Sequence, residues 1–187
     1  MCVKLNRIQT NKLQSNLDAI HAVFEVSLFD IELNTKPSNT LVIHQQILIN
    51  SLSLVIEESL DLNSLIALKL DNTHVNLDNL FLDEPDLFFE RNWFLSLLDA
   101  IADPPYGTTL DHSNQEEFFK IFSQSCLLTE KDCEIYDWVG CSGSGRDDCS
   151  EWSEYFKLGR EWWGNWCLTI YSPKQNKACL LLASSTD

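Results

Sequence analysis

Positively charged residues are scarce in this chain of 187 residues. It has 13 Lys and Arg against 28 Asp and Glu, which gives a formal net charge of −15. Binding to the phosphate backbone of nucleic acids requires clustered Lys and Arg, and docking on anionic lipid requires a basic surface. The composition therefore argues against nucleic acid and against a membrane surface as partners.

Long hydrophobic runs are also missing. No apolar segment typical of a secretory signal follows the first residues. The most apolar window, Leu41 to Ile56, contains His44-Gln45-Gln46 and is too short and too polar to span a bilayer. Six of the seven cysteines fall between Cys126 and Cys179, and without an export signal we expect reduced, buried thiols. These observations predict a cytoplasmic protein.

Glycine and tryptophan are absent from the first half of the chain. All six Gly and all six Trp lie beyond Arg91, and no Gly/Ser-rich linker separates the halves. Hydrophobic residues make up 44% of the chain, which is enough for a packed core. We therefore expect a single compact domain, residues 1–187, with a Leu/Asn-rich lobe (1–84) and a Trp/Cys-rich lobe (85–187).

Hydrophobic periodicity predicts about four helices. Leu13, Leu17 and Ile20 share one helical stripe, and Pro85 is typical of a first helical position. A capping box at Ser113 and a similar pattern at Thr129 indicate two further helices. The predicted helices begin near residues 13, 85, 113 and 129, and the last runs through Trp138.

Strands are predicted between these helices and at the end of the chain. Within residues 24–33 the alternation of apolar residues changes phase, which indicates a β-bulge. Residues 41–49 and 52–56 are rich in β-branched residues and predict strands around an Asn50-Ser51 turn, whereas 60–82 is ambiguous. Residues 166–171 and 178–182 predict a hairpin that is apolar on both faces. The predicted fold is α+β, with this hairpin central in a mixed or antiparallel sheet.

No motif in the chain identifies an activity. The cysteines include no C-x-x-C pair, the four histidines are scattered, and the loop at 140–146 lacks the order of a phosphate-binding loop. The acidic run at 147–154 does not match a calcium-binding loop. We therefore expect no catalytic residue, no cofactor and no bound metal. A zinc site and a cysteine nucleophile are the weaker alternatives.

Acidic and aromatic residues are interleaved between Asp99 and Glu161. This segment contains fourteen acidic residues and five basic ones. On the helix predicted after Thr129, three of the acids would share one face. Trp and Tyr are the residues most enriched at binding hot spots, and carboxylates favour a cationic partner. The candidate partner-binding residues are Glu130, Glu134, Asp137, Asp147, Asp148, Glu151, Trp152 and Glu154.

These features favour an acidic bacterial binding protein that neutralises a basic protein. The physical analogy is with an immunity protein, an inhibitor of a nuclease-type toxin, and the chain would be a monomer or form a heterodimer with the toxin domain. One alternative is a small hydrolase that uses carboxylates or a Cys/His pair in a cleft between the lobes. Another is a scaffold whose Trp-rich segment is a self-contact, and in the simplest alternative the Trp residues fill the core.

Overall fold

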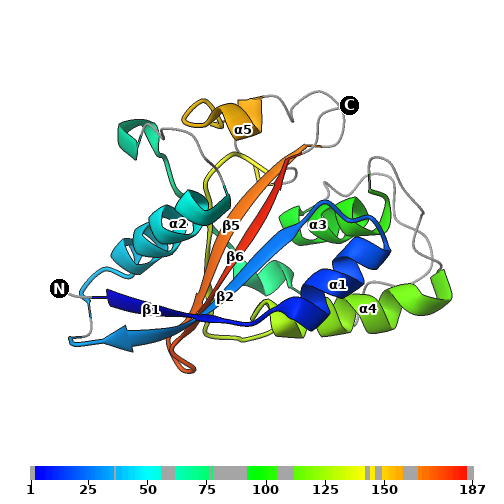
Figure 1. The fold of residues 1–187 in the computed structure, drawn as a ribbon, viewed down its shortest axis with the longest axis horizontal. Helices are drawn as coiled ribbons and strands as arrows, with labels where there is room; N and C mark the ends of the chain where they lie inside the picture. The colour runs from blue at the N-terminus through cyan, green and yellow to red at the C-terminus, as the bar shows by residue number, and fades with distance from the viewer. Residues whose placement is uncertain are drawn as a thin grey trace.

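A six-stranded antiparallel sheet forms the centre of the molecule, in the order β1-β2-β6-β5-β4-β3 (Figure 1). The computed structural model describes residues 3–35, 37–55, 62–75, 77, 92–104, 112–141, 144–145, 149–157 and 164–184. The predicted α+β class and the central position of the C-terminal hairpin are confirmed. The elements are β1 (Val3–Ile8), α1 (Asn11–Ala19), β2 (Glu25–Leu33), α2 (Leu41–Val55), η1 (Leu62–Ser64), β3 (Leu68–Leu70), η2 (Asn72–His74), α3 (Trp93–Ala102), α4 (His112–Ser125), β4 (Glu134–Asp137), α5 (Glu154–Lys157), β5 (Asn165–Ser172) and β6 (Lys177–Ser184).

Helices cover both faces of the sheet (Figure 1). Helix α2 lies on one face, and α1, α3 and α4 lie on the other. The hydrophobic core is divided accordingly, with Leu17, Phe94 and Phe122 in one cluster and Ile47 and Leu48 in the other. All residues of β5 are buried, since they lie between the two clusters. This burial explains why the hairpin sequence is apolar on both faces.

Strand β2 has no β-bulge, so that prediction is wrong. Its pairing with β1 is continuous from Leu28 to Leu33, and its pairing with β6 is continuous from Glu25 to Asp30. Apolar residues of both parities occur in β2 because both of its faces are covered. Val26 packs with the α1, α3 and α4 layer, whereas Phe29 packs with α2.

Residues Leu41–Val55 form one helix, α2, and the two strands predicted there are wrong. The buried side chains of Ile43, Ile47 and Ser51 recur every four residues, which is one face of a helix. Asn50 forms no turn: it is exposed, and its Nδ2 donates to the Gln46 carbonyl at 2.7 Å. A short apolar run rich in β-branched residues does not by itself separate a strand from a buried helix.

The segment after α4 is a turn followed by a strand, and the helix predicted from Thr129 to Trp138 is wrong. Leu127 has a φ of 64°, and the Leu128 N–H donates to the Ser123 carbonyl at 2.9 Å, which ends α4. Strand β4 then pairs with β3 and β5. Glu130 precedes this strand, and residues three apart in a strand point to opposite faces. Glu130, Glu134 and Asp137 therefore do not share the predicted face.

The other three predicted helices are confirmed in the described part of the chain as α1, α3 and α4. The Asn92 side chain caps α3 by accepting the N–H groups of Phe94 and Leu95, and the predicted beginning of that helix at Pro85 lies outside the described residues. Among those residues α4 begins at His112, one position before the predicted cap at Ser113. The ambiguous segment contains η1, β3 and η2.

The sheet takes β1, β2 and β3 from residues 1–84 and β4, β5 and β6 from later in the chain; the division into two lobes stays a prediction. None of the helices in the described ranges combines the length and the apolar character needed to cross a membrane.

Candidate functional site

Helix α5 packs over the end of the sheet where β5 begins and β6 ends (Figure 1). Two side chains from these strands attach it. Asn165 Nδ2 donates to the Phe156 carbonyl at 2.6 Å, and Ser184 Oγ donates to the Tyr155 carbonyl at 2.8 Å. The first turn is further held by Ser153 Oγ, which accepts the Tyr155 N–H at 3.2 Å. The central hairpin therefore fixes the position of this short helix.

Three exposed carboxylates lie at the α5 end of the sheet, where Tyr155 is half-buried. Glu151 lies in the turn that leads into α5, and Glu154 is its first residue. Glu25, the first residue of β2, is opposite Leu182 near the end of β6. Burial raises the pKa of Tyr155 to about 12, and the charge of Glu25 adds to this effect because it lies close to the phenol. We call Glu25, Glu151, Glu154 and Tyr155 the α5 acidic patch.

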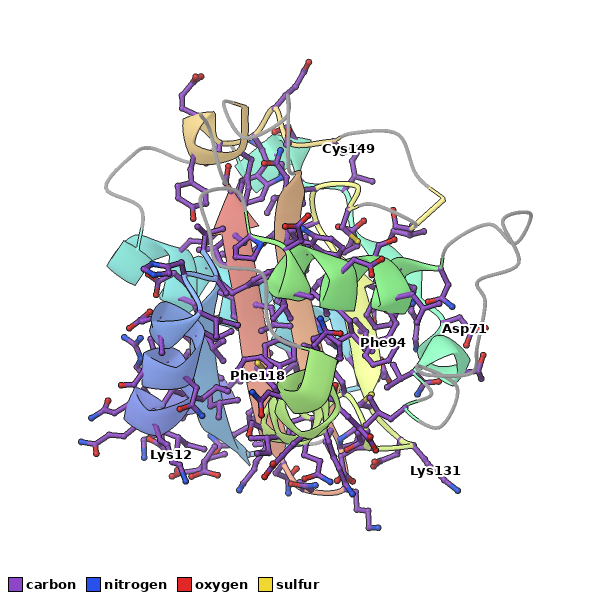
Figure 2. The ribbon with its side chains drawn as sticks, turned by 90° about the vertical axis from the view of Figure 1, so that its right-hand side faces the viewer. Lys12, Asp71, Phe94, Phe118, Lys131 and Cys149 are labelled. Atoms are coloured by element: carbon purple, nitrogen blue, oxygen red, sulfur yellow. The ribbon has the colours of Figure 1, made fainter. Side chains whose placement is uncertain are left out.

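Lysines gather at the opposite end of the molecule. Lys174 lies in the turn between β5 and β6, and Lys177 begins β6. Figure 2 shows Lys12 and Lys131 at this lower end, far from Cys149 beside the α5 turn. Exposed acids also occur on other elements, so charge alone does not define the patch. The patch differs because Glu25, from a distant part of the chain, lies near the half-buried Tyr155 of the helix that Glu151 and Glu154 flank.

The structure separates the eight predicted partner-binding residues. Glu151 and Glu154 lie together at the α5 end, and both are exposed. Glu130 and Glu134 are half-buried, in and just after the turn that follows α4. Asp137 and Trp152 are buried, at 0% and 2% exposure. Asp147 and Asp148 lie outside the described residues.

Asp137 is a structural residue of the β4 end. Its Oδ1 accepts the N–H groups of Val139 and Gly140 at 3.0 and 3.1 Å, and its Oδ2 accepts the Cys141 N–H at 3.0 Å. Three backbone donors that would otherwise be buried without partners are satisfied in this way. The carboxylate holds the loop after β4 in place and is not available to a partner in this conformation.

The tryptophans near the acidic segment fill the core. Trp138, Trp152 and Trp166 are each at most 2% exposed. The Trp152 Nε1–H donates to the Trp138 carbonyl at 3.0 Å, and the Trp138 Nε1–H donates to Thr169 Oγ1 at 2.8 Å. These three rings are therefore not surface anchors. They fill the core, which is what the simplest alternative drawn from the sequence predicts. Trp162 and Trp163 lie outside the described residues.

A buried polar cluster beneath α2 was not anticipated from the sequence. His44 Nδ1 lies 2.8 Å from Thr169 Oγ1, and its ring is 4.6 Å from that of Tyr136. The Trp138 indole N–H donates to the same Thr169 Oγ1 at 2.8 Å, so this hydroxyl group joins His44 and Trp138. His44 Nε2 has no hydrogen-bond partner among the described residues. Burial lowers the pKa of His44 to about 4.

Glu134 lies at the edge of the same cluster. It accepts a hydrogen bond from Thr40 Oγ1 at 2.5 Å, and the Lys69 ammonium is 3.3 Å away. Partial burial alone would raise the pKa of Glu134, but Thr40 and Lys69 outweigh it and hold the pKa below its ordinary value. Glu134 therefore joins β4 to β3 and to the beginning of α2.

Cys133, Cys141 and Cys167 do not have the character of a nucleophile. A surface pocket of about 420 Å³ is lined by Lys69, Leu70, Asp71, Asn72 and Cys133. Burial raises the pKa of Cys133 to about 11, whereas a catalytic cysteine needs a lowered pKa. Burial also raises the pKa values of Cys141 and Cys167. These three thiols therefore do not support the Cys/His alternative.

Metal-ligating residues do not converge within the described ranges, where no group of three or more His, Cys, Asp or Glu side chains could hold an ion. Comparison with known proteins adds no assignment. No family model and no curated protein sequence matches this chain.

Proposed function

We propose that this chain is a cytoplasmic binding protein that neutralises a basic protein, acting as an immunity protein for a nuclease-type bacterial toxin. The observation that carries the proposal is the α5 acidic patch, in which Glu25 lies near Tyr155 and the exposed Glu151 and Glu154 flank the same short helix. The net charge of −15 supports it, because a nuclease cleft attracts phosphate and therefore attracts carboxylates placed where phosphates would lie.

The binding surface differs from the one inferred from the sequence. The indole rings of Trp138 and Trp152 are enclosed, so the aromatic contribution is assigned to Tyr155 alone. The exposed part of a tyrosine ring contributes contact area at low entropic cost. The three carboxylates would steer the basic partner toward this end of the sheet.

The direct test is binding to a basic nuclease encoded beside this chain in its genome. Titration calorimetry of the Glu25→Gln/Glu151→Gln/Glu154→Gln variant should give at least about tenfold weaker binding than the natural chain. The matched control, Asp30→Asn/Glu116→Gln/Glu117→Gln, removes the same charge from exposed residues elsewhere. Equal weakening by both variants, or a complex insensitive to salt, would contradict the proposal.

A further inference from the structure

Two thiols from distant parts of the chain meet in the core. Cys126 directly follows the last residue of α4, and Cys179 lies within β6; both are 0% exposed. Their side chains are hydrogen-bonded to each other, and both are free thiols. The two residues are 53 positions apart in the sequence, so the contact is created by the packing of α4 on the sheet.

The backbone fixes each partner differently. The Cys126 N–H donates to the Phe122 carbonyl at 2.9 Å, and the chain leaves the helix at the next residue. Cys179 is opposite Leu28 in β2 and Ile170 in β5, so it is held by strands on both sides. The pair therefore joins the α4 layer to the centre of the sheet.

The neighbouring cysteines have other surroundings. Cys133 lies beside Asn72 and the Leu128 carbonyl. Cys167 lies in the core cluster on the opposite face of the sheet, where the charge of Asp137 acts on it. Cys126 and Cys179 are thus distinguished by their contact with each other, and Cys167 provides an equally buried control.

We propose that Cys126 and Cys179 are a latent disulfide, which closes when the chain meets a low-molecular-weight disulfide such as oxidised glutathione. The Cys126 thiolate, after losing its proton to water, attacks one glutathione sulfur, and one glutathione leaves and takes up a proton. The Cys179 thiolate then attacks the Cys126 sulfur of the mixed disulfide and releases the second glutathione. The protein loses two electrons and two protons, and glutathione disulfide gains both.

Cys126 is the residue that reacts first. It belongs to the helical layer, whose movement away from the sheet exposes it, whereas Cys179 is fixed between two strands. Burial, and then the neighbouring Cys126 thiol, raise the pKa of Cys179 well above its ordinary value, so thiolate is scarce while the layers are closed. The pair stays reduced in the packed protein and is oxidised when α4 opens.

The test is a peptide map of the full chain after incubation with oxidised glutathione a few degrees below its melting temperature. Trypsin cleaves after Lys and Arg, so Cys126 falls in peptide 121–131 and Cys179 in peptide 178–187, each without another cysteine. We expect these two peptides to be joined in a nonreducing digest. The loop that the bond closes should raise the melting temperature by about 10 °C.

Two variants separate the steps. Cys179→Ala should retain glutathione on the 121–131 peptide, which makes it about 305 Da heavier. Cys167→Ala should still form the 121–131 to 178–187 link. Unmodified thiols in both peptides of the natural chain, or a link from either of them to another cysteine, would overturn the proposal even if neither variant folds. Because this measurement involves no partner, it is independent of the α5 acidic patch.

Discussion

At the scale of single residues, burial decides which acidic side chains are available for binding. Asp137 is fully buried and is used by three backbone donors, whereas Glu151 and Glu154 are exposed at the α5 end. Burying a carboxylate without hydrogen-bond partners is strongly unfavourable, so the Asp137 carboxylate has to accept these backbone N–H groups in the folded chain. The same residue type therefore has a structural function in one place and a proposed binding function in another.

Removing the Asp137 carboxylate should be severely destabilising. Asp137→Ala leaves the N–H groups of Val139, Gly140 and Cys141 without an acceptor, so we expect the free energy of unfolding to fall by about 3 kcal/mol. Urea unfolding followed by circular dichroism measures this loss. Asp132→Ala is the control, because exposed Asp132 accepts a single N–H among the described residues, that of Lys174, and it should cost less than about 1 kcal/mol. Equal losses in the two variants would contradict the assigned role.

His44 should make stability depend on pH below neutrality. Its pKa is about 4 in the folded chain and about 6.5 when unfolded, so the unfolded chain binds the proton first as pH falls. The stability gained from neutral His44 is complete above pH 6.5 and is lost as pH falls toward 4. Between pH 6.5 and pH 5 we expect a loss of about 1.5 kcal/mol, measured by urea unfolding.

The variant His44→Phe tests the assignment. Between pH 6.5 and pH 5, the free energy of unfolding of this variant should fall by about 1.5 kcal/mol less than that of the natural chain. The exposed His21 provides the control, and His21→Gln should retain the pH dependence of the natural chain. A His44→Phe variant with an unchanged pH profile would show that other groups cause the dependence.

At the scale of elements, α2 illustrates how tertiary packing determines the secondary structure of an apolar segment. Its residues Ile43, Ile47 and Leu48 are fully buried against the sheet. The same face includes Ser51, whose buried Oγ has no hydrogen-bond partner in the part of the chain that the structure describes. A strand pair with a turn at Asn50-Ser51 would expose this hydroxyl, whereas the helix encloses it.

Replacing Ser51 by Ala should therefore stabilise the protein. The substitution removes an unpaired buried hydroxyl and improves helix propensity, so we expect a gain of about 1 kcal/mol in the free energy of unfolding. Ser15→Ala, at an exposed position of α1, is the matched control and should gain only about half as much, from propensity alone. A loss of stability in Ser51→Ala would contradict the packing described for α2.

At the scale of the whole molecule, unbalanced charge is the dominant feature. With a net charge of −15 the folded chain repels itself, and a basic partner would relieve this repulsion. The lysines at the β5–β6 turn and the acids of the α5 end make the two ends of the sheet unequal. The orientation of a bound basic protein should follow from this difference.

Salt should stabilise the isolated chain. Raising NaCl from about 20 to about 200 mM shortens the Debye length from about 20 to about 7 Å, so we expect the melting temperature at pH 7 to rise by about 3 °C. The effect should be smaller at pH 5, closer to the isoelectric point near 4.5. Calorimetry at both pH values measures it, and an equal rise at the two would indicate a cause other than charge repulsion.

Patterns contained within one element could be read from the sequence. The stripe of Leu13 and Leu17 predicts α1, and the two-sided apolar hairpin predicts the central β5 and β6. The α+β class and the acidic surface charge follow from such local patterns and from composition. They are determined locally because the periodicity of an element reflects the faces that it buries.

The remaining features depend on contacts between distant residues. Residues 41–55 are a helix because they cover a sheet face, and Thr129 to Trp138 are not one because β4 pairs with β3 and β5. The four tryptophans within the described ranges are enclosed because both faces of the sheet are covered. Glu25 joins Tyr155 only through the pairing of β2 with β6, and Cys126 meets Cys179 only when α4 docks. Composition established how much charge and apolar surface the chain has, and tertiary packing decided which of these side chains remain accessible, because accessibility is created by neighbours far away in the sequence.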